Sequence, residues 1–78
     1  MKRCKYDPQA DAVYVYFNNK PYAFGKELDE VRRIDYAVDN TPIGIEILSV
    51  SKGVNLNDFP YQKEIMKCLQ QYNIKIYA

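Results

Sequence analysis

The residues most suited to chemistry are four carboxylates near the predicted turns and strands: Asp7, Asp11, Asp35 and Glu46. Carboxylate oxygens are the ligands that Mg²⁺ and Ca²⁺ prefer, and a cation held by them could support hydrolysis of a phosphodiester. Their spacing matches no calcium-loop or nuclease signature. Each also has an ordinary structural explanation, since Asp7 fits a turn cap, Asp11 a backbone contact where a strand begins, and Glu46 an ion pair across strands. A metal-dependent phosphodiester-cleaving enzyme is therefore an alternative function, and no metal or other cofactor is predicted.

Aromatic side chains on a sheet can stack nucleic-acid bases. The tyrosines that invite this interpretation are Tyr14, Tyr16, Tyr22 and Tyr36. A stacking platform also needs a positive groove, whereas the chain has 11 basic and 10 acidic residues and a net charge of +1. Asp35 and Glu46 are moreover predicted on the same face. An RNA-binding module, supported best by Lys2, Arg3 and Lys5, is therefore a second alternative, and nucleic acid is not the expected partner.

Tyrosine and arginine in the middle of a face are typical of protein interfaces. The predicted patch consists of Tyr14, Tyr16, Arg33, Gly44 and Glu46. Such a patch could serve self-association or a different partner. The competing interpretation is a solvated sheet face, and the residues alone leave the two open.

Nucleophilic catalysis has little support because the chain contains no histidine, the commonest general base. The two cysteines, Cys4 and Cys68, are far apart and lack the CxxC spacing of a zinc site. Neither has a visible activating neighbour, and Cys68 falls on the apolar stripe of a predicted helix. We therefore expect two reduced, half-buried thiols in a cytoplasmic protein, and no catalytic residue.

The stretch that must position the tyrosines is residues 12–17, where apolar residues alternate with tyrosines. This alternation predicts a strand with one apolar face, and Asp7-Pro8 before it is typical of a turn. Residues 31–38 and 41–49 predict a hairpin closed by a two-residue turn at Asp39-Asn40. The register of this hairpin pairs Tyr36 with Ile43, Ile34 with Ile45, and Arg33 with Glu46. The next even register would place two acidic residues opposite each other, which is unfavourable.

The predicted strands form an antiparallel meander with two unlike faces. One face collects Val13, Val15, Phe17, Ile34, Tyr36, Val38, Ile43, Ile45 and Ile47. The other collects Tyr14, Tyr16, Arg33, Asp35, Gly44 and Glu46. A glycine inside a strand often marks the close approach of another group, and at Gly44 we expect a tyrosine ring from the neighbouring strand.

The remaining elements are short strands at residues 2–6, 22–28 and 74–77, a polar crossing at 49–58, and a helix at about 59–72 with Asp58 as its N-cap. The apolar stripe of this helix consists of Tyr61, Ile65, Cys68, Leu69 and Tyr72. It is the natural cover for the apolar face. The predicted fold class is therefore α+β, an antiparallel β-meander of about four or five strands with one C-terminal helix packed on one face.

Length and hydropathy limit the class of protein. Seventy-eight residues make one domain, residues 1–78, whose stability margin is thin, and dimerisation is a common remedy. The longest apolar run is six residues, too short to span a bilayer, and no signal peptide is visible. We therefore expect a cytoplasmic homodimer without a membrane partner.

The segments YDPQADAVYVYF and PIGIEILSVSKGV, in this order, resemble the small bacterial family catalogued as domain of unknown function 2283, through its YDxxADxxYI opening and its GIEIL strand. The resemblance spans about residues 6–54. The family positions present here are Tyr6, Asp7, Ala10, Asp11, Tyr14, Gly44, Glu46, Ile47 and Leu48. The sequence departs at Tyr16, where the family usually has a residue such as arginine. The resemblance implies an antiparallel sheet with a helix and no established catalytic residue.

Members of this family are often encoded beside small proteins suspected of being toxins, which implies a role as the partner of another protein. We therefore predict a small non-enzymatic protein-interaction module, antitoxin-like or inhibitor-like, that neutralises or regulates another bacterial or phage-borne protein.

Overall fold

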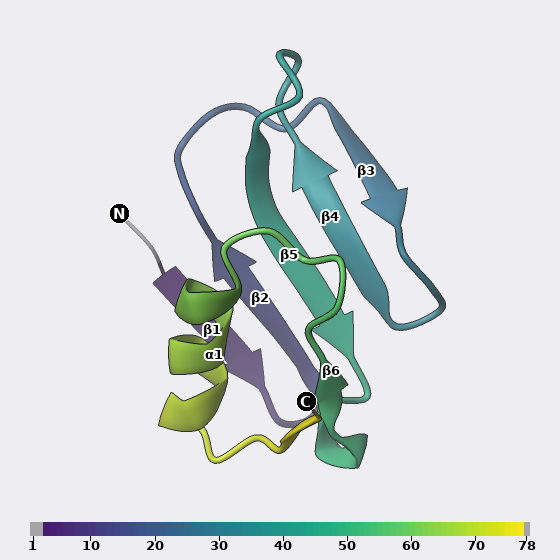
Figure 1. The fold of residues 1–78 in the computed structure, drawn as a ribbon, viewed down its shortest axis with the longest axis vertical. Helices are drawn as coiled ribbons and strands as arrows, with labels where there is room; N and C mark the ends of the chain where they lie inside the picture. The colour runs from purple at the N-terminus through teal and green to yellow at the C-terminus, as the bar shows by residue number, and fades with distance from the viewer. Residues whose placement is uncertain (1–2, 78) are drawn as a thin grey trace.

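A computed structural model of the chain describes residues 3–77 and shows a five-stranded antiparallel sheet with one helix packed on it (Figure 1). The strands lie in the order β1-β2-β5-β4-β3, with bounds Arg3–Asp7 (β1), Ala12–Tyr16 (β2), Phe24–Glu27 (β3), Arg32–Tyr36 (β4) and Pro42–Leu48 (β5). A 3₁₀ turn at Val50–Lys52 follows, and β6 (Val54–Asn55) pairs in parallel with β7 (Ile76–Tyr77). Helix α1 spans Gln62–Gln71. The predicted α+β fold class is confirmed.

The core lies between one face of the sheet and a layer made by α1 and the segment that leads to it (Figure 1). Side chains of β2 and β5 reach it at every second residue, while α1 contributes residues four apart, because these are the periods of a strand and a helix. The largest fully buried side chains are Ile45, Ile47, Ile65, Leu69, Val13, Val15, Val50 and Val54. The alternation predicted for residues 12–17 and 43–47 is therefore confirmed.

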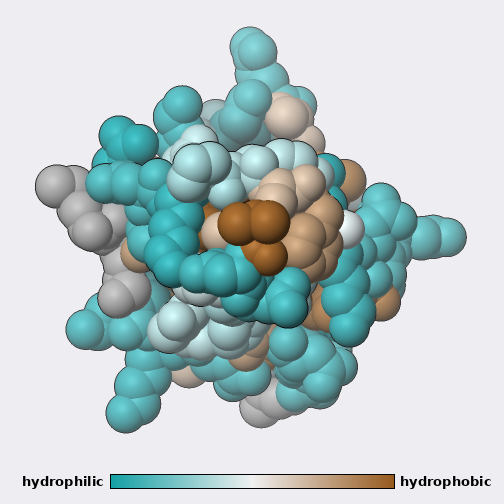
Figure 2. Space-filling model, turned by 90° about the horizontal axis from the view of Figure 1, so that it is seen from above, coloured by the Kyte–Doolittle hydropathy of each residue, from teal (hydrophilic) through white to brown (hydrophobic). Residues whose placement is uncertain are grey.

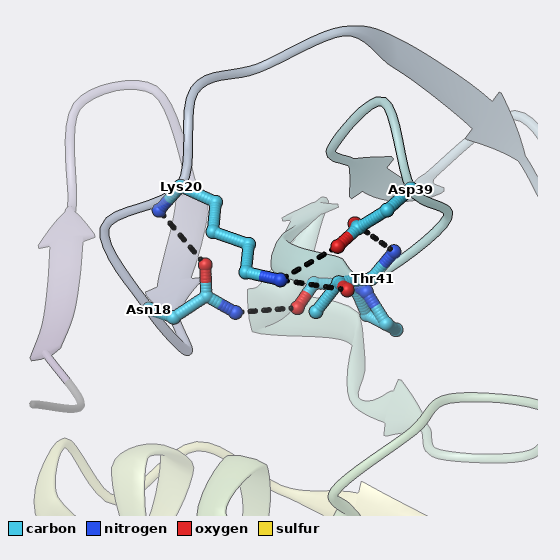
Figure 3. A network of polar contacts seen from close by, with 5 residues as sticks. Asn18, Lys20, Asp39 and Thr41 are labelled. Carbon is cyan, nitrogen blue, oxygen red and sulfur yellow. Dashed lines mark hydrogen bonds and ion pairs between the residues drawn. The ribbon is translucent and has the colours of Figure 1, made fainter.

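The strand order departs from a strict meander at one connection. After β2 the chain passes the ends of β5 and β4 and begins β3 at the far edge of the sheet, so that β2 pairs with β5 (Figure 1). A polar network holds this connection against the β4–β5 hairpin (Figure 3). Lys20 Nζ lies 2.7 Å from Asp39 Oδ2 and donates to Thr41 Oγ1 at 3.2 Å. Asn18 Nδ2 donates to the carbonyl oxygen of Pro42 at 3.0 Å.

The β4–β5 hairpin has the predicted register in the part far from its turn, but the register differs from the prediction near the turn. The confirmed pairs are Arg33 with Glu46 and Ile34 with Ile45. A bulge between Asp35 and Tyr36 then shifts the ladder, so that Tyr36 faces Pro42 and not Ile43. The predicted two-residue turn is therefore wrong. A bulge inserts one extra residue into a strand, and an alternation of apolar and polar residues does not reveal it.

The bulge also changes which side chains are buried at the tip of the hairpin. Ala37 is buried, whereas Val38, predicted on the apolar face, is 87% exposed. Tyr36 is half-buried against the core, and its ring stacks on that of Phe24 with centroids 5.1 Å apart. Figure 2 views the molecule from this end and shows a small hydrophobic area surrounded by hydrophilic side chains. The prediction that Val38 belongs to the core is therefore wrong.

Helix α1 begins at Gln62 and not at about residue 59, and Asp58 is not its N-cap. Tyr61 occupies that position with φ 54° and makes no side-chain cap. The N–H of Phe59 donates to the carbonyl oxygen of Leu56, so the chain first forms a turn that buries the Phe59 ring. In the predicted stripe, Ile65, Cys68 and Leu69 are buried and Tyr61 and Tyr72 are exposed. Burial of Phe59 therefore decides where the helix can begin.

The three predicted short strands are present with changed bounds. Arg3–Asp7 extends one residue beyond the predicted end, and Lys2 lies outside the described residues. Phe24–Glu27 and Ile76–Tyr77 are shorter than predicted. The partner of the last strand is β6, which lies within the stretch predicted as a polar crossing.

Cys4 of β1 and Cys68 of α1 form a disulfide, with Cα atoms 5.7 Å apart. The prediction of two reduced thiols is therefore wrong. Spacing rules could not find this pair because 64 positions separate the two cysteines, and only the packing of α1 on β1 brings them together. Cysteine usage thus gives no argument for a reducing compartment, and a cytoplasmic location stays a prediction. Among residues 3–77, no helix is long and apolar enough to cross a membrane.

Candidate interface on the outer face of the sheet

The face of the sheet that points away from α1, called here the outer face, carries two rows of residues across all five strands. Residues directly opposite one another in an antiparallel pair lie on the same face. From β1 to β3, the first row is Lys5, Tyr14, Glu46, Arg33 and Glu27. The second row is Arg3, Tyr16, Gly44, Asp35 and Gly25. The two rows bring together all five predicted interface residues: Tyr14, Tyr16, Arg33, Gly44 and Glu46.

The centre of the outer face is an ionic network around a buried carboxylate. Asp35 is only 4% exposed, although no layer formed by residues 3–77 covers this face. Its Oδ2 accepts a 2.5 Å hydrogen bond from the Tyr14 hydroxyl, and its Oδ1 lies 3.0 Å from Nε of Arg33. The Arg33–Asp35 contact is an ion pair without hydrogen-bond geometry. Arg33 also lies 3.4 Å from Glu46, so one guanidinium group serves two carboxylates.

The surroundings of the network raise the pKa values of two of its residues, Tyr14 and Arg33. Burial and, after it, the hydrogen bond to Asp35 raise the pKa of Tyr14 well above the ordinary value. Burial acts against the charged form of Arg33, but the carboxylates of Asp35 and Glu46 outweigh it and raise the pKa of Arg33. Tyr14 and Arg33 therefore keep their protons throughout the neutral pH range.

Two glycines make room for this network. A Cβ atom at Gly44 would lie 2.6 Å from Cε1 and 2.7 Å from the hydroxyl oxygen of Tyr14. The predicted approach of a tyrosine ring to Gly44 is therefore confirmed. A Cβ atom at Gly25 would lie 3.0 Å from Oδ1 of Asp35 and 3.3 Å from the hydroxyl oxygen of Tyr22. The hydroxyl of the exposed Tyr22 therefore lies beside Gly25 at the β3 side of the network.

Tyr16 extends the aromatic surface toward β1. Its ring centroid lies 4.5 Å from that of Tyr14, and the guanidinium carbon of Arg3 lies 5.2 Å from it, which is a cation–π distance. A hollow of about 430 Å³ adjoins Tyr14, and Lys5 and the half-exposed Leu48 form part of its wall. The outer face therefore combines two tilted aromatic rings with an adjoining hollow.

Part of the two rows could not be predicted from the sequence. Gly25 and Glu27 of β3 were not recognised, because they join the face only through pairing with β4. The tight connection predicted at Asp29-Glu30 indicated that these two strands are neighbours, but a two-residue turn there would pair Glu27 with Arg32, whereas the structure pairs Glu27 with Arg33. Tyr36, which was grouped with the stacking tyrosines, packs against the core instead.

The four carboxylates of the alternative metal site lie in three separate places. Asp7 caps the β1–β2 turn by accepting hydrogen bonds from two backbone amides. Asp11 accepts hydrogen bonds from the backbone N–H and the hydroxyl of Ser51, at 2.9 and 2.6 Å. Asp35 and Glu46 belong to the outer-face network. Within residues 3–77, no group of three or more His, Cys, Asp or Glu side chains could hold a metal ion.

Comparison with known proteins places the sheet in a family. Residues 3–51 match the family described as "Protein of unknown function (DUF2283)". The matched part contains the whole five-stranded sheet with its outer face and ends before α1. No curated protein and no solved structure matches the chain.

Proposed function

We propose that this chain, which belongs to the DUF2283 family of proteins of unknown function, is a small non-enzymatic protein-interaction module that binds its partner through the outer face. The observation that carries the proposal is the patch of Tyr14, Tyr16 and Arg33 organised around the buried carboxylate of Asp35. Tyrosine and arginine are concentrated where proteins bind each other. A face that met only water would gain little from a buried carboxylate, whose desolvation is costly.

The patch is also ordered before any partner arrives. The Tyr14 ring lies on Gly44, and its hydroxyl is held by Asp35. Arg33 is held by carboxylates on two sides. Side chains that are already restricted lose less conformational entropy when a partner covers them. The network therefore favours binding by restricting Tyr14 and Arg33 before the partner covers them.

The mixture of charges on the outer face suits a protein better than nucleic acid. Glu46 and Glu27 lie among the aromatic and basic residues and would repel phosphate groups. We assign no catalytic role to these carboxylates, because Arg33 neutralises Glu46 and nothing brings Asp7 or Asp11 to them.

The specific role that we propose is a neutralising or regulatory one, antitoxin-like or inhibitor-like, toward another bacterial or phage-borne protein. The ground for this role is the gene neighbourhood that the family resemblance implies, and the ground for a homodimer is the small size of the chain. The protein partner would cover the tyrosine rings and leave the helical layer free.

The test is a pull-down of the tagged protein from its native host, with and without nuclease, read by mass spectrometry. We expect a stoichiometric protein that survives nuclease and whose recovery falls about tenfold with Tyr16→Glu, which puts a charge in the middle of the patch. Met66→Glu, at an exposed position on α1, is the matched control and should change nothing. Recovery of nucleic acid alone, or equal recovery with Tyr16→Glu, would contradict the proposal.

A further inference from the structure

We propose that the outer face is shaped for a second copy of this chain, related to the first by a twofold axis that runs along β5. This inference rests on the proposed function, because the second copy occupies the same face that the partner protein would cover when it binds. It is carried by the order of charges in the first row, from Lys5 at one edge of the sheet to Glu27 at the other.

The first row is electrically polarised. Lys5 on β1 and Glu27 on β3 are both exposed, and Arg3 adds a second positive charge at the β1 edge. Neighbouring strands lie about 4.8 Å apart, so four strand spacings separate Lys5 from Glu27 by roughly 19 Å. These two side chains are therefore too far apart to pair with each other in one copy. Each can instead pair with the oppositely charged side chain of a second copy.

A twofold axis along β5 lays each row on the same row of the second copy in reverse order. Lys5 of each copy then meets Glu27 of the other, and Tyr14 meets Arg33 of the other, a cation–π combination. Packed sheets cross at about 30°, which offsets the ends of the rows, and the long Lys5 and Glu27 side chains can span that offset. Opposite charges therefore meet at both edges of the face.

Other twofold arrangements of the same face either bring like charges together or leave one edge of the sheet uncovered. An axis across the strands would lay β1 on β1, so that the basic edges of the two copies, with Arg3 and Lys5, would face each other. An axis along the strands but between β2 and β5 would place Lys5 on Arg33. Facing like charges oppose association. An axis between β5 and β4 would place Glu46 on Arg33 of the other copy, but it would leave β1, with Lys5, beyond the edge of the second copy. The axis along β5 is the one that overlaps all five strands and pairs the charges at both edges.

One pair in the selected arrangement works against it. Glu46 lies on the axis and meets Glu46 of the second copy, although each is already paired with its own Arg33 at 3.4 Å. Glu46→Gln removes this repulsion and sacrifices only a partly exposed ion pair, which contributes little. The arrangement therefore predicts that Glu46→Gln tightens the dimer about threefold, the opposite of what truncation at an interface centre usually does.

The small size of the face sets the expected affinity. Five strands of about five residues cover roughly 24 by 17 Å, which is below the area of most stable protein interfaces. We therefore expect a weak dimer, with a Kd on the order of 100 μM, that exchanges rapidly with monomer.

The test is sedimentation equilibrium of the full chain at low ionic strength, from about 20 μM to about 2 mM, a range that brackets the affinity of a small interface. Lys5→Glu and Glu27→Lys are each expected to weaken self-association about tenfold, because each creates two like-charge pairs per dimer. An equimolar mixture of the two variants should recover wild-type affinity within about twofold, since both edge pairs are again of opposite sign. Lys63→Glu, the same charge change on α1, is the matched control and should have no effect.

The outcomes separate this inference from the proposed function. A wild-type chain that stays monomeric over the whole range, or a mixture no tighter than its components, overturns the second-copy arrangement. If a host protein is nevertheless lost with Tyr16→Glu, the proposed function survives with a different partner. A dimer whose affinity is unchanged by Tyr16→Glu and by the edge-charge variants overturns the second-copy arrangement, and the pull-down then decides the proposed function separately. Circular dichroism of each variant shows whether it has kept the fold; Lys5 and Glu27 are exposed, so we expect that it has.

Discussion

The two faces of this sheet come from one alternation of residues, yet different forces order them. On the core face, branched aliphatic side chains of β2 and β5 are buried beneath α1, which is linked covalently to β1 by Cys4–Cys68. On the outer face no layer of the described fold lies above the side chains, and order comes from an ionic network around Asp35 and a ring seated on Gly44. A small domain can thus have one face that stabilises it through burial and another that is specified by polar contacts.

The largest expected effect comes from removing the Cys4–Cys68 disulfide on the core face. Replacing both Cys4 and Cys68 with alanine releases a cross-link between positions 64 apart, which the chain-entropy account values at about 4 kcal/mol of unfolding free energy. Urea denaturation of the two proteins measures the difference. Adding a reductant should destabilise the wild type and leave the alanine variant unchanged. Equal stability of the wild type with and without reductant would show that the disulfide contributes nothing to the unfolding free energy.

A cavity in the core face should cost slightly less. Ile45 is 0% exposed at the centre of β5, and Ile45→Ala is expected to lower the unfolding free energy by about 3 kcal/mol. The matched control is Leu48→Ala on the same strand, where the side chain is half-exposed on the outer face and the loss should stay below about 1 kcal/mol. Similar losses at the two positions would mean that the faces do not differ as described.

Filling the space under Tyr14 should disturb the outer face without touching the core. The Cβ atom of Gly44→Ala would meet the Tyr14 ring at 2.6 Å and the carbonyl oxygen of Val15 at 2.8 Å, so the ring must leave Asp35. We expect a loss of about 2 kcal/mol, typical of overpacking, in urea denaturation. Absorbance titration should also show the pKa of Tyr14 falling toward its ordinary value. Gly25→Ala, whose Cβ atom would meet side-chain atoms only and none nearer than 3.0 Å, should have the smaller effect.

The smallest effect is expected at the loop network of Figure 3, outside both faces. Hydrogen bonds from Lys20 and then Thr41 hold the pKa of Asp39 well below its usual range. Because the folded-state pKa is the lower one, this stabilisation is present above the unfolded pKa of about 3.9 and is lost as the pH falls below it. The melting temperature of the wild type should therefore exceed that of Asp39→Asn at pH 7, and the gap should narrow below about pH 4. A gap that is constant with pH would assign the stabilisation to other groups.

Patterns within one strand predicted most of the fold. The alternation around Val13 and Ile45 identified the core face, and a glycine in a strong strand identified the seat of a neighbouring ring at Gly44. The errors occurred where a distant contact overrode a local signal. A bulge exposed Val38, and burial of Phe59 displaced the helix start that Asp58 had suggested.

The sequence by itself determined which side chains share a face, because a strand repeats every two residues and this period is local. Only the tertiary structure decided which strands are neighbours, since β2 lies beside β5 through a connection that crosses the sheet. That neighbour relation creates the row from Lys5 to Glu27 and brings α1 to Cys4. The outer face is therefore a product of strand order, which depends on chain crossings and long-range packing that no single segment encodes.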